Sequence, residues 1–302
     1  MRTIVSTLVV MSVLSFGCEN SGKTTSTTRG EIRVVFDESV QPAFQRQVDD
    51  FQSTYPDAKV QPRYREAREA VVDFVSDSVR VIGMGRPFNA EELRVLKEAE
   101  IEYQSYEVAL DGIVVIVHKE NRISELRMSQ LDSIFSGALT RWPGRNATIE
   151  PVVGDINSSV YEMVRDSVLK GKSFARSTTR VVPSLKLIDY VSTIKNSIGL
   201  VGLSWLRGHE DEVTVVRLSR LDSTGTYGKP YSPAQAYIYQ RNYPLFRMVY
   251  MYNREIQRDV SLGLIAYMAG VQGQKIFLNS GLVPVTMPVR LVELTSKQVQ
   301  QQ

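Results

Sequence analysis

Three polar turns in the sequence have the composition of an anion-binding site. They are residues 37–39 (Asp-Glu-Ser), 83–87 (Gly-Met-Gly-Arg-Pro) and 155–159 (Asp-Ile-Asn-Ser-Ser). Each lies where a predicted strand gives way to a predicted helix, whose N-terminus offers free N–H groups and a partial positive charge to an oxyanion. Hydroxyl groups and an arginine fork add hydrogen bonds. The alternative is structural: serines that cap helices and an ordinary surface arginine.

The pattern around these turns predicts the elements that position them. From residue 31 onward, β-prone runs alternate with stretches that carry apolar residues at helical spacing, such as Phe44, Val48 and Phe51. Repeated β-α units predict an α/β fold with a parallel sheet, and such sheets bind ligands at the carboxyl ends of their strands. Strands are expected at residues 32–36, 60–64, 79–83, 149–153, 198–203, 213–218 and 237–252, and helices at 41–55, 66–75, 89–99, 129–135, 158–169, 185–194 and 260–279.

A long apolar run at residues 108–117 is interrupted by Asp111 and Gly112. The interruption could be a hairpin turn, but it also suits a strand that leaves one lobe and enters another, and we favour the second interpretation. Asp111, Gly112 and the return near Tyr237 would then be the hinge that closes the lobes over a ligand. The expected lobes are residues 31–112 with 235–302, and residues 113–234.

The first residues have the features of an export signal. Arg2 is positively charged, and residues 4–16 are mostly apolar but too few to span a bilayer. The single cysteine, Cys18, follows small residues in a pattern similar to a bacterial lipobox. We expect a signal peptide at residues 1–17, a lipid on Cys18 that holds the protein on the periplasmic side of a membrane, and a polar tether over residues 18–30; an incidental cysteine is the alternative.

Residues 17–24 also match the phosphate-loop pattern G-x-x-x-x-G-K-[ST], which would indicate a nucleotide hydrolase. That site requires a buried strand before the loop and a helix after it. Here a cleavable apolar segment precedes the pattern and polar residues without helical periodicity follow it. We therefore interpret the match as chance.

The composition disfavours two further classes of protein. The net charge is only +3 over 302 residues and no long basic run is present, so the sequence gives no support to a nucleic-acid groove. The two histidines, His118 and His209, lie far apart and without ligand spacing, so we propose neither a metal site nor a histidine-based catalytic triad. We expect a binding protein without a cofactor and not an enzyme.

A series of short motifs follows in a fixed order along the mature chain. They are Asp37-Glu38-Ser39, Tyr64-Arg65-Glu66-Ala67, Gly85-Arg86-Pro87, Ala109-Leu110-Asp111-Gly112-Ile113, Ile134-Phe135-Ser136-Gly137, Tyr243-Pro244-Leu245 and Gly281-Leu282-Val283-Pro284. The series resembles the phosphate-type substrate-binding proteins of ABC importers, in particular a variant common in Bacteroidetes-like bacteria. The resemblance extends from about residue 31 to residue 294.

The resemblance implies a two-lobed type II periplasmic-binding-protein fold with two crossover strands as the hinge. It also implies a ligand between the lobes and the permease of an ABC importer as partner; we expect a monomer. The implied ligand contacts are Ser39, Glu66, Ala67, Arg86, Asn157, Ser158 and Ser159. The third turn departs from the family pattern, because Gly154 and Asp155 precede it where the family has an arginine and then Ser-Gly-Thr.

Inorganic phosphate is the ligand that the resemblance favours. Phosphate near neutral pH keeps a proton and can donate a hydrogen bond to a carboxylate, whereas sulfate cannot. Glu66 and Glu38 are the preferred proton acceptors, ahead of Asp155; the alternative is that these groups cap helices or pair with Arg65 and Arg68. A receptor for sulfate or molybdate, a sensory or adhesive module and an anion-dependent hydrolase stay open as alternative functions.

Overall fold

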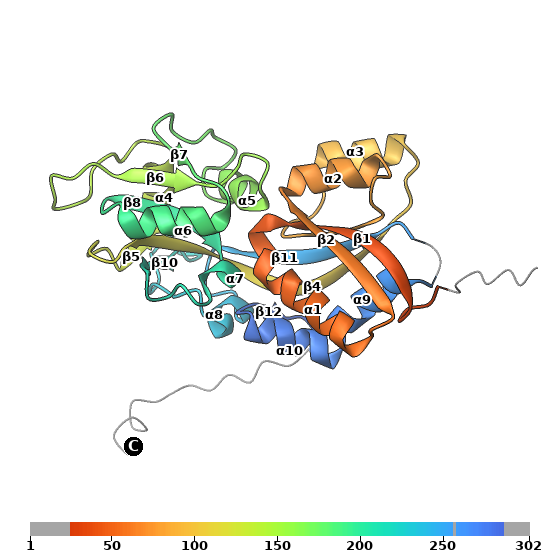
Figure 1. The fold of residues 1–302 in the computed structure, drawn as a ribbon. Helices are drawn as coiled ribbons and strands as arrows, with labels where there is room; N and C mark the ends of the chain where they lie inside the picture. The colour runs from red at the N-terminus through yellow and green to blue at the C-terminus, as the bar shows by residue number, and fades with distance from the viewer. Residues whose placement is uncertain (1–24, 256–257, 287–302) are drawn as a thin grey trace, which may run out of the picture.

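The computed structural model describes residues 25–255 and 258–286, and two lobes lie side by side in it (Figure 1). The expected signal peptide, the lipidation of Cys18 and most of the tether lie outside these residues. Within them, no helix is both long and apolar enough to cross a membrane.

The first lobe is built on three parallel strands in the order β2-β1-β3. Phe36 of β1 stacks on Phe44 of α1 with ring centroids 4.3 Å apart, which fixes the helix against the sheet. The expected β-α alternation is confirmed here. Its elements are β1 (Gly30–Asp37), α1 (Gln41–Thr54), β2 (Ala58–Arg65), α2 (Ala67–Val75), β3 (Val81–Met84) and α3 (Ala90–Glu98).

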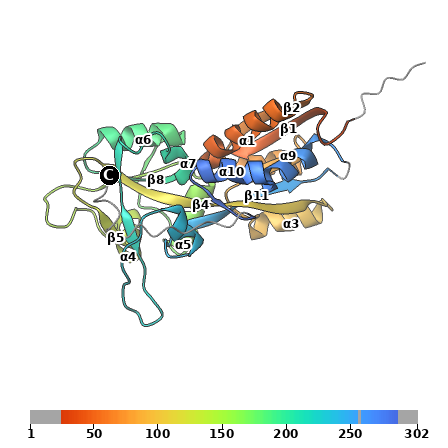
Figure 2. The same ribbon diagram turned by 90° about the horizontal axis from the view of Figure 1, so that it is seen from below.

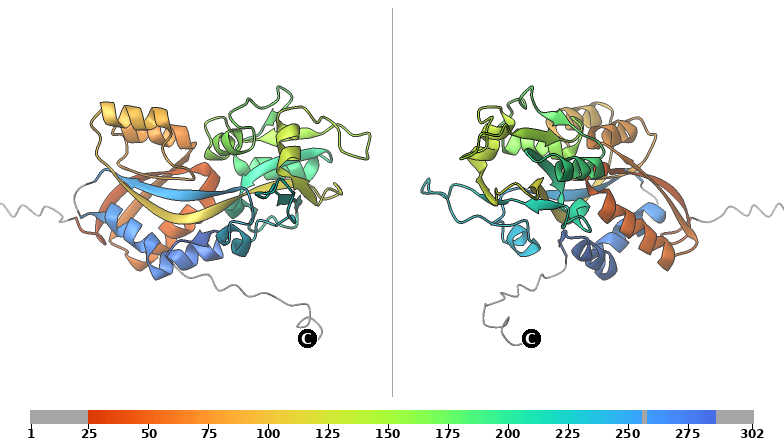
Figure 3. Two further views of the ribbon diagram at one scale, coloured as in Figure 1. Left: turned by 180° about the vertical axis from the view of Figure 1, so that it is seen from behind. Right: turned by 60° about the vertical axis from the view of Figure 1, so that its left-hand side comes forward.

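Two antiparallel strands, β4 (Gln104–His118) and β11 (Phe246–Asn253), connect the lobes. β4 runs through without a turn: its first half pairs with β11, and from Ile113 onward it pairs with β8 (Ser197–Gly202) of the second lobe (Figure 3). The hairpin alternative for Asp111 and Gly112 is therefore wrong, because both residues lie inside one continuous strand. Burial on both sides explains the long apolar run.

The second lobe is a smaller sheet covered by helices around a core that contains Phe135 and Trp142. Ile238, Tyr243 and Leu245 also pack into this core, although they lie within residues 235–302, which were expected to belong to the first lobe. The chain over residues 220–230 projects from the lobe (Figure 2). The elements are α4 (Met128–Phe135), β6 (Glu150–Val153), α5 (Ser159–Ser167), β7 (Thr179–Arg180), α6 (Ser184–Thr193), β8 (Ser197–Gly202), α7 (Leu203–Leu206) and β9 (Val213–Val215), with β5 (Glu125–Arg127) and β10 (Arg217–Ser219) as a separate pair.

Two expectations near the C-terminus are wrong in part. The predicted strand over residues 237–252 begins instead with a short helix, α8 (Gln235–Tyr239), and only its second part is β11. The predicted helix over residues 260–279 divides at Gly270 into α9 (Val260–Ala269) and α10 (Val271–Asn279), before β12 (Val283–Pro284). The division lets Gly273 approach the backbone of Tyr267 so closely that a Cβ atom would lie 2.4 Å from its carbonyl oxygen.

Candidate functional site

A small cavity lies where the two lobes meet, and several of the predicted site residues surround it. Its volume is about 10 Å³, close to the space that one water requires. Glu38, Ser39 and Glu66 contribute from the first lobe, and Asp155 and Ser158 from the second. The remaining lining residues are Gly154, Val160, Val182, Ser184, Leu187 and Leu200. The first and third polar turns of the sequence therefore converge.

Next to this cavity, the fully buried carboxylate of Asp37 accepts hydrogen bonds from both lobes. The Ser39 amide and hydroxyl donate to it at 3.0 and 2.8 Å, and the Gly85 amide donates at 3.0 Å. The Ser159 hydroxyl, from the first residue of α5, donates as well. Two amides and two hydroxyls are the kind of donor set that the three turns predicted for an oxyanion, and in this structure they serve a side chain of the protein itself.

Arg247 is a buried arginine beside the cavity turns that the sequence reasoning missed. It faces Asp111 across β11 and β4, is 5% exposed, and donates to Asp111 Oδ2 from Nε at 3.0 Å and from Nη2 at 2.8 Å. Nη2 also donates to Ser39 Oγ at 2.9 Å, and Nη1 donates to Ser159 Oγ at 2.5 Å. The sequence did contain a signal for it: Arg247 is the only charged residue in the run of residues 246–252. A charge that is buried in such a strand needs hydrogen-bonding partners.

The predicted hinge residues lie at this junction. Asp111 is fully buried and accepts a further hydrogen bond from the Leu203 amide at 3.1 Å. Burial raises the pKa of Asp111, and Arg247 opposes this effect. Gly112 packs so tightly that a Cβ atom would lie 2.8 Å from Ile238 Cδ1. The Asp111 side chain thus bonds to both the returning strand and the second lobe.

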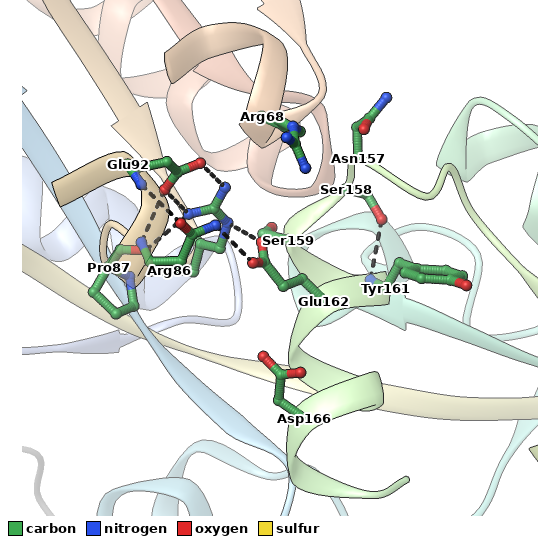
Figure 4. Close-up of polar contacts among 12 residues, drawn as sticks. Arg68, Arg86, Pro87, Glu92, Asn157, Ser158, Ser159, Tyr161, Glu162 and Asp166 are labelled. Atoms are coloured by element: carbon green, nitrogen blue, oxygen red, sulfur yellow. Dashed lines mark hydrogen bonds and ion pairs between the residues drawn. The ribbon is translucent and has the colours of Figure 1, made fainter. Parts of the chain in front are cut away.

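Arg86 does not line the cavity and instead belongs to a buried ion-pair cluster (Figure 4). Its Nη1 and Nη2 donate to the two carboxylate oxygens of Glu92 at 2.7 Å each, and Nη1 donates to the Pro87 carbonyl at 2.9 Å. Its Nε lies 2.6 Å from a carboxylate oxygen of Glu162 on α5. Asn89 Nδ2 donates to the same carboxylate at 3.0 Å. Arg86 therefore links the first lobe to the second.

The turn at α5 meets α2 through the main chain, since the Arg68 amide donates to the Asn157 carbonyl at 3.1 Å. Ser158 is the N-cap of α5 and accepts from the Tyr161 amide at 3.1 Å, as the structural alternative predicted (Figure 4). The Ser39 hydroxyl does not cap a helix, because it donates to the carboxylate of Asp37. Ala67, the first residue of α2, is buried.

The alternative that Arg65 and Arg68 neutralise the predicted carboxylates is wrong. Arg65 pairs with Glu69 and Asp73, and Arg68 pairs with Glu91 at 3.5 Å. Neither arginine forms an ion pair with Glu38, Glu66 or Asp155.

Glu66 and Glu38 have different surroundings. The Glu66 side chain makes no capping bond to α2, and burial together with nearby Asp37, Glu38 and Asp155 raises its pKa to about 8. Glu38 accepts from the Ser184 amide at 3.0 Å and hydroxyl at 2.7 Å, across the lobes. Burial raises the pKa of Glu38, and these bonds oppose the shift. Glu66 is thus largely protonated at neutral pH.

Within residues 25–255 and 258–286, no group of three or more His, Cys, Asp and Glu side chains could hold a metal ion.

Comparison with known proteins identifies the family. The model of the PBP superfamily domain matches residues 21–271. The chain belongs to this superfamily. A phosphate-binding protein PstS of Staphylococcus aureus strain USA300 is 23% identical over 245 residues, which are 79% of this chain and 73% of the relative.

Solved structures of other proteins show the same fold. A phosphate ABC transporter substrate-binding protein with bound phosphate from Clostridium perfringens superimposes with a TM-score of 0.74 at 20% identity, over 85% of this chain and 100% of that one. An ABC-type phosphate transport receptor from Vibrio cholerae gives 0.66 at 15% identity, over 84% and 100%. The family resemblance and the two-lobed α/β periplasmic-binding fold are confirmed. The superfamily match also supports a binding protein rather than an enzyme.

Proposed function

We propose that this member of the PBP superfamily is a solute-binding protein that captures inorganic phosphate between its lobes and delivers it to the permease of an ABC importer. The observation that carries the proposal is the meeting of hydroxyl groups from both lobes, Ser39 and Ser159, beside a buried arginine. The names of the relatives agree with it: they are phosphate-binding proteins, and the Clostridium perfringens structure holds phosphate.

The ligand oxygens receive hydrogen bonds from the Ser39 and Ser159 hydroxyls and from the amides at the start of α2 and α5, beginning with Ala67. Asn157 and Ser158 shape the third turn. Glu66 faces the ligand with a carboxyl group that can share the phosphate proton. Above a pH of about 8, where Glu66 is ionised, phosphate can donate its proton to the carboxylate. Sulfate has no proton to donate, so the ionised Glu66 disfavours it.

The closed cavity of about 10 Å³ is smaller than phosphate, so the ligand enters when the lobes part. β4 and β11 are the covalent connections that bend, with Asp111 and Gly112 at the crossing. We place the return of the chain to the first lobe at Phe246 rather than at residue 235, because Ile238 and Leu245 pack in the second lobe. Arg86 serves closure through Glu162 rather than as the ligand's arginine fork.

The same proposal includes export and anchoring. A signal peptide at residues 1–17 and a lipid on Cys18 would hold a monomeric receptor at the membrane, with residues 18–30 as the tether. Metabolic labelling with a fatty acid tests this part, since Cys18→Ser should abolish the label and release the protein.

Isothermal titration of the mature chain with phosphate, sulfate and molybdate tests the function. We expect saturable binding of phosphate at pH 8.5 and at least a tenfold preference over sulfate, on the order of one lost hydrogen bond to a charged group. Glu66→Gln should reduce this preference, because a neutral amide no longer depends on the ligand for a proton. Absence of phosphate binding, or equal affinity for all three anions, refutes the proposal.

A further inference from the structure

Arg247 bonds to both lobes through one guanidinium. The group reaches from β11 to Asp111 of the neighbouring β4, with which it pairs at 2.8 and 3.0 Å. It also contacts Ser39 of the first lobe and Ser159 of the second, and these bonds satisfy further N–H groups of the buried charge.

The direction of these hydrogen bonds follows from the chemistry of the side chains. A guanidinium only donates, so the oxygens of Ser39 and Ser159 must act as acceptors toward Arg247. Each hydroxyl has one hydrogen, which is then free to be donated elsewhere. Both hydroxyls are placed to donate to the carboxylate of Asp37, and their oxygens lie 2.9 Å from each other. Arg247 thus makes two hydroxyl groups, one from each lobe, into donors toward an anion.

Asp37 still accepts two hydrogen bonds if the hydroxyls of Ser39 and Ser159 no longer donate to it. The amides of Ser39 and Gly85 donate to it at 3.0 Å each. A ligand oxygen can therefore accept the hydrogen bonds of the two hydroxyls while the two amides still donate to Asp37. A buried carboxylate without donors would cost free energy and oppose binding.

Gly85 leaves room for the guanidinium, since a Cβ atom there would lie 2.6 Å from both Cζ and Nη1 of Arg247. Gly202 leaves room for the backbone of Ser39, because a Cβ atom there would lie 2.4 Å from the Ser39 carbonyl oxygen. The buried guanidinium of Arg86 cannot hold the two hydroxyls in place of Arg247, because it pairs with Glu92 and Glu162.

We propose that Arg247 is the positioning residue of the oxyanion site: it holds the Ser39 and Ser159 hydroxyls as donors, and the ligand replaces Asp37 as their acceptor. This inference rests on the proposed capture of phosphate. It assigns the positive charge of the site to β11, at a position where the motif series carries no arginine.

The test compares phosphate affinity by isothermal titration for the wild type, Arg247→Lys and Gly85→Ala. Lysine keeps the charge but cannot reach both hydroxyls with a planar fork. The added methyl of Gly85→Ala displaces the guanidinium and leaves the arginine in the chain. We expect each change to weaken phosphate binding roughly 10- to 100-fold, as for loss of a hydrogen bond to a charged group.

The matched controls are Arg254→Gln, an arginine just beyond β11 that donates to the Phe74 carbonyl at 2.5 Å, and Gly228→Ala, whose added methyl meets only the Arg220 carbonyl oxygen at 4.0 Å. Both should bind phosphate within about twofold of the wild type, since neither touches the site.

A double-mutant cycle separates positioning from mere structural support. If Arg247 acts through the hydroxyl, Ser159→Ala weakens binding in the wild type and has little further effect in Arg247→Lys. Additive effects, or wild-type affinity in both Arg247→Lys and Gly85→Ala, overturn the inference while the proposed function stands. If Arg247→Lys does not fold, the cycle is made with Gly85→Ala. Wild-type protein that does not bind phosphate overturns both.

Discussion

The ion pair between Arg86 and Glu162 gives a sharp prediction, because its two partners belong to different lobes. Arg86 is 6% exposed, and its Nε lies 2.6 Å from Glu162. Removing one partner of a buried pair costs about 3–5 kcal/mol when the other charge is left alone. Here Glu92 continues to hold Arg86 through two hydrogen bonds of 2.7 Å. Glu162→Gln removes only the 2.6 Å ion pair and leaves Arg86 paired with Glu92, so the expected cost is about 1.5–3 kcal/mol, roughly half that of a buried charge left alone.

This cost falls on the closed state, since parting the lobes would separate Glu162 from Arg86 in any case. The phosphate affinity of Glu162→Gln should accordingly drop roughly 10- to 150-fold. Isothermal titration measures the affinity, and small-angle scattering of the ligand-free protein should show a larger radius of gyration. Glu91→Gln is the control, because its pair with Arg68 is 3.5 Å long with both side chains more than half exposed. Affinity within twofold of the wild type for Glu162→Gln would refute the idea of an interlobe latch.

Two further predictions concern pH and capping. The pKa of Glu66 is raised to about 8 from 4.5, so the folded chain holds this proton more tightly than the unfolded chain does, and stability should fall as the pH rises from about 4.5 to about 8. Urea unfolding should show a flatter pH profile for Glu66→Gln than for the wild type or Glu91→Gln; an unchanged profile contradicts the assignment. Asn89→Ala should lower the unfolding free energy by about 1 kcal/mol through loss of the α3 cap, and Asn89→Ser should restore it. Both variants lose the bond to Glu162 and should bind phosphate more weakly, so normal affinity in Asn89→Ser would count against that bond.

Much of the fold was readable from local patterns. The helix expected at residues 41–55 is α1, and Asn89 forms the capping box of α3 with Glu92. The exceptions are instructive: residues 237–239 carry alternating Tyr and Ile that suit a strand, yet they form α8 because Ile238 packs into the second lobe's core. Tertiary packing overrides weak local preference there.

The sequence by itself determined the order of the β-α units and the two turns that supply Ser39 and Ser158 to one cavity, and it favoured a crossover at Asp111 over a hairpin, which the structure then excluded. These features depend on residue type and spacing, which are local. Only the tertiary structure shows which buried arginine meets hydroxyl groups from both lobes. Arg86 stands in a promising turn but pairs with Glu92 and Glu162, whereas Arg247, hidden in an apolar strand, meets hydroxyls from both lobes. The partners of a buried charge come from distant parts of the chain, and spacing along the sequence does not encode them.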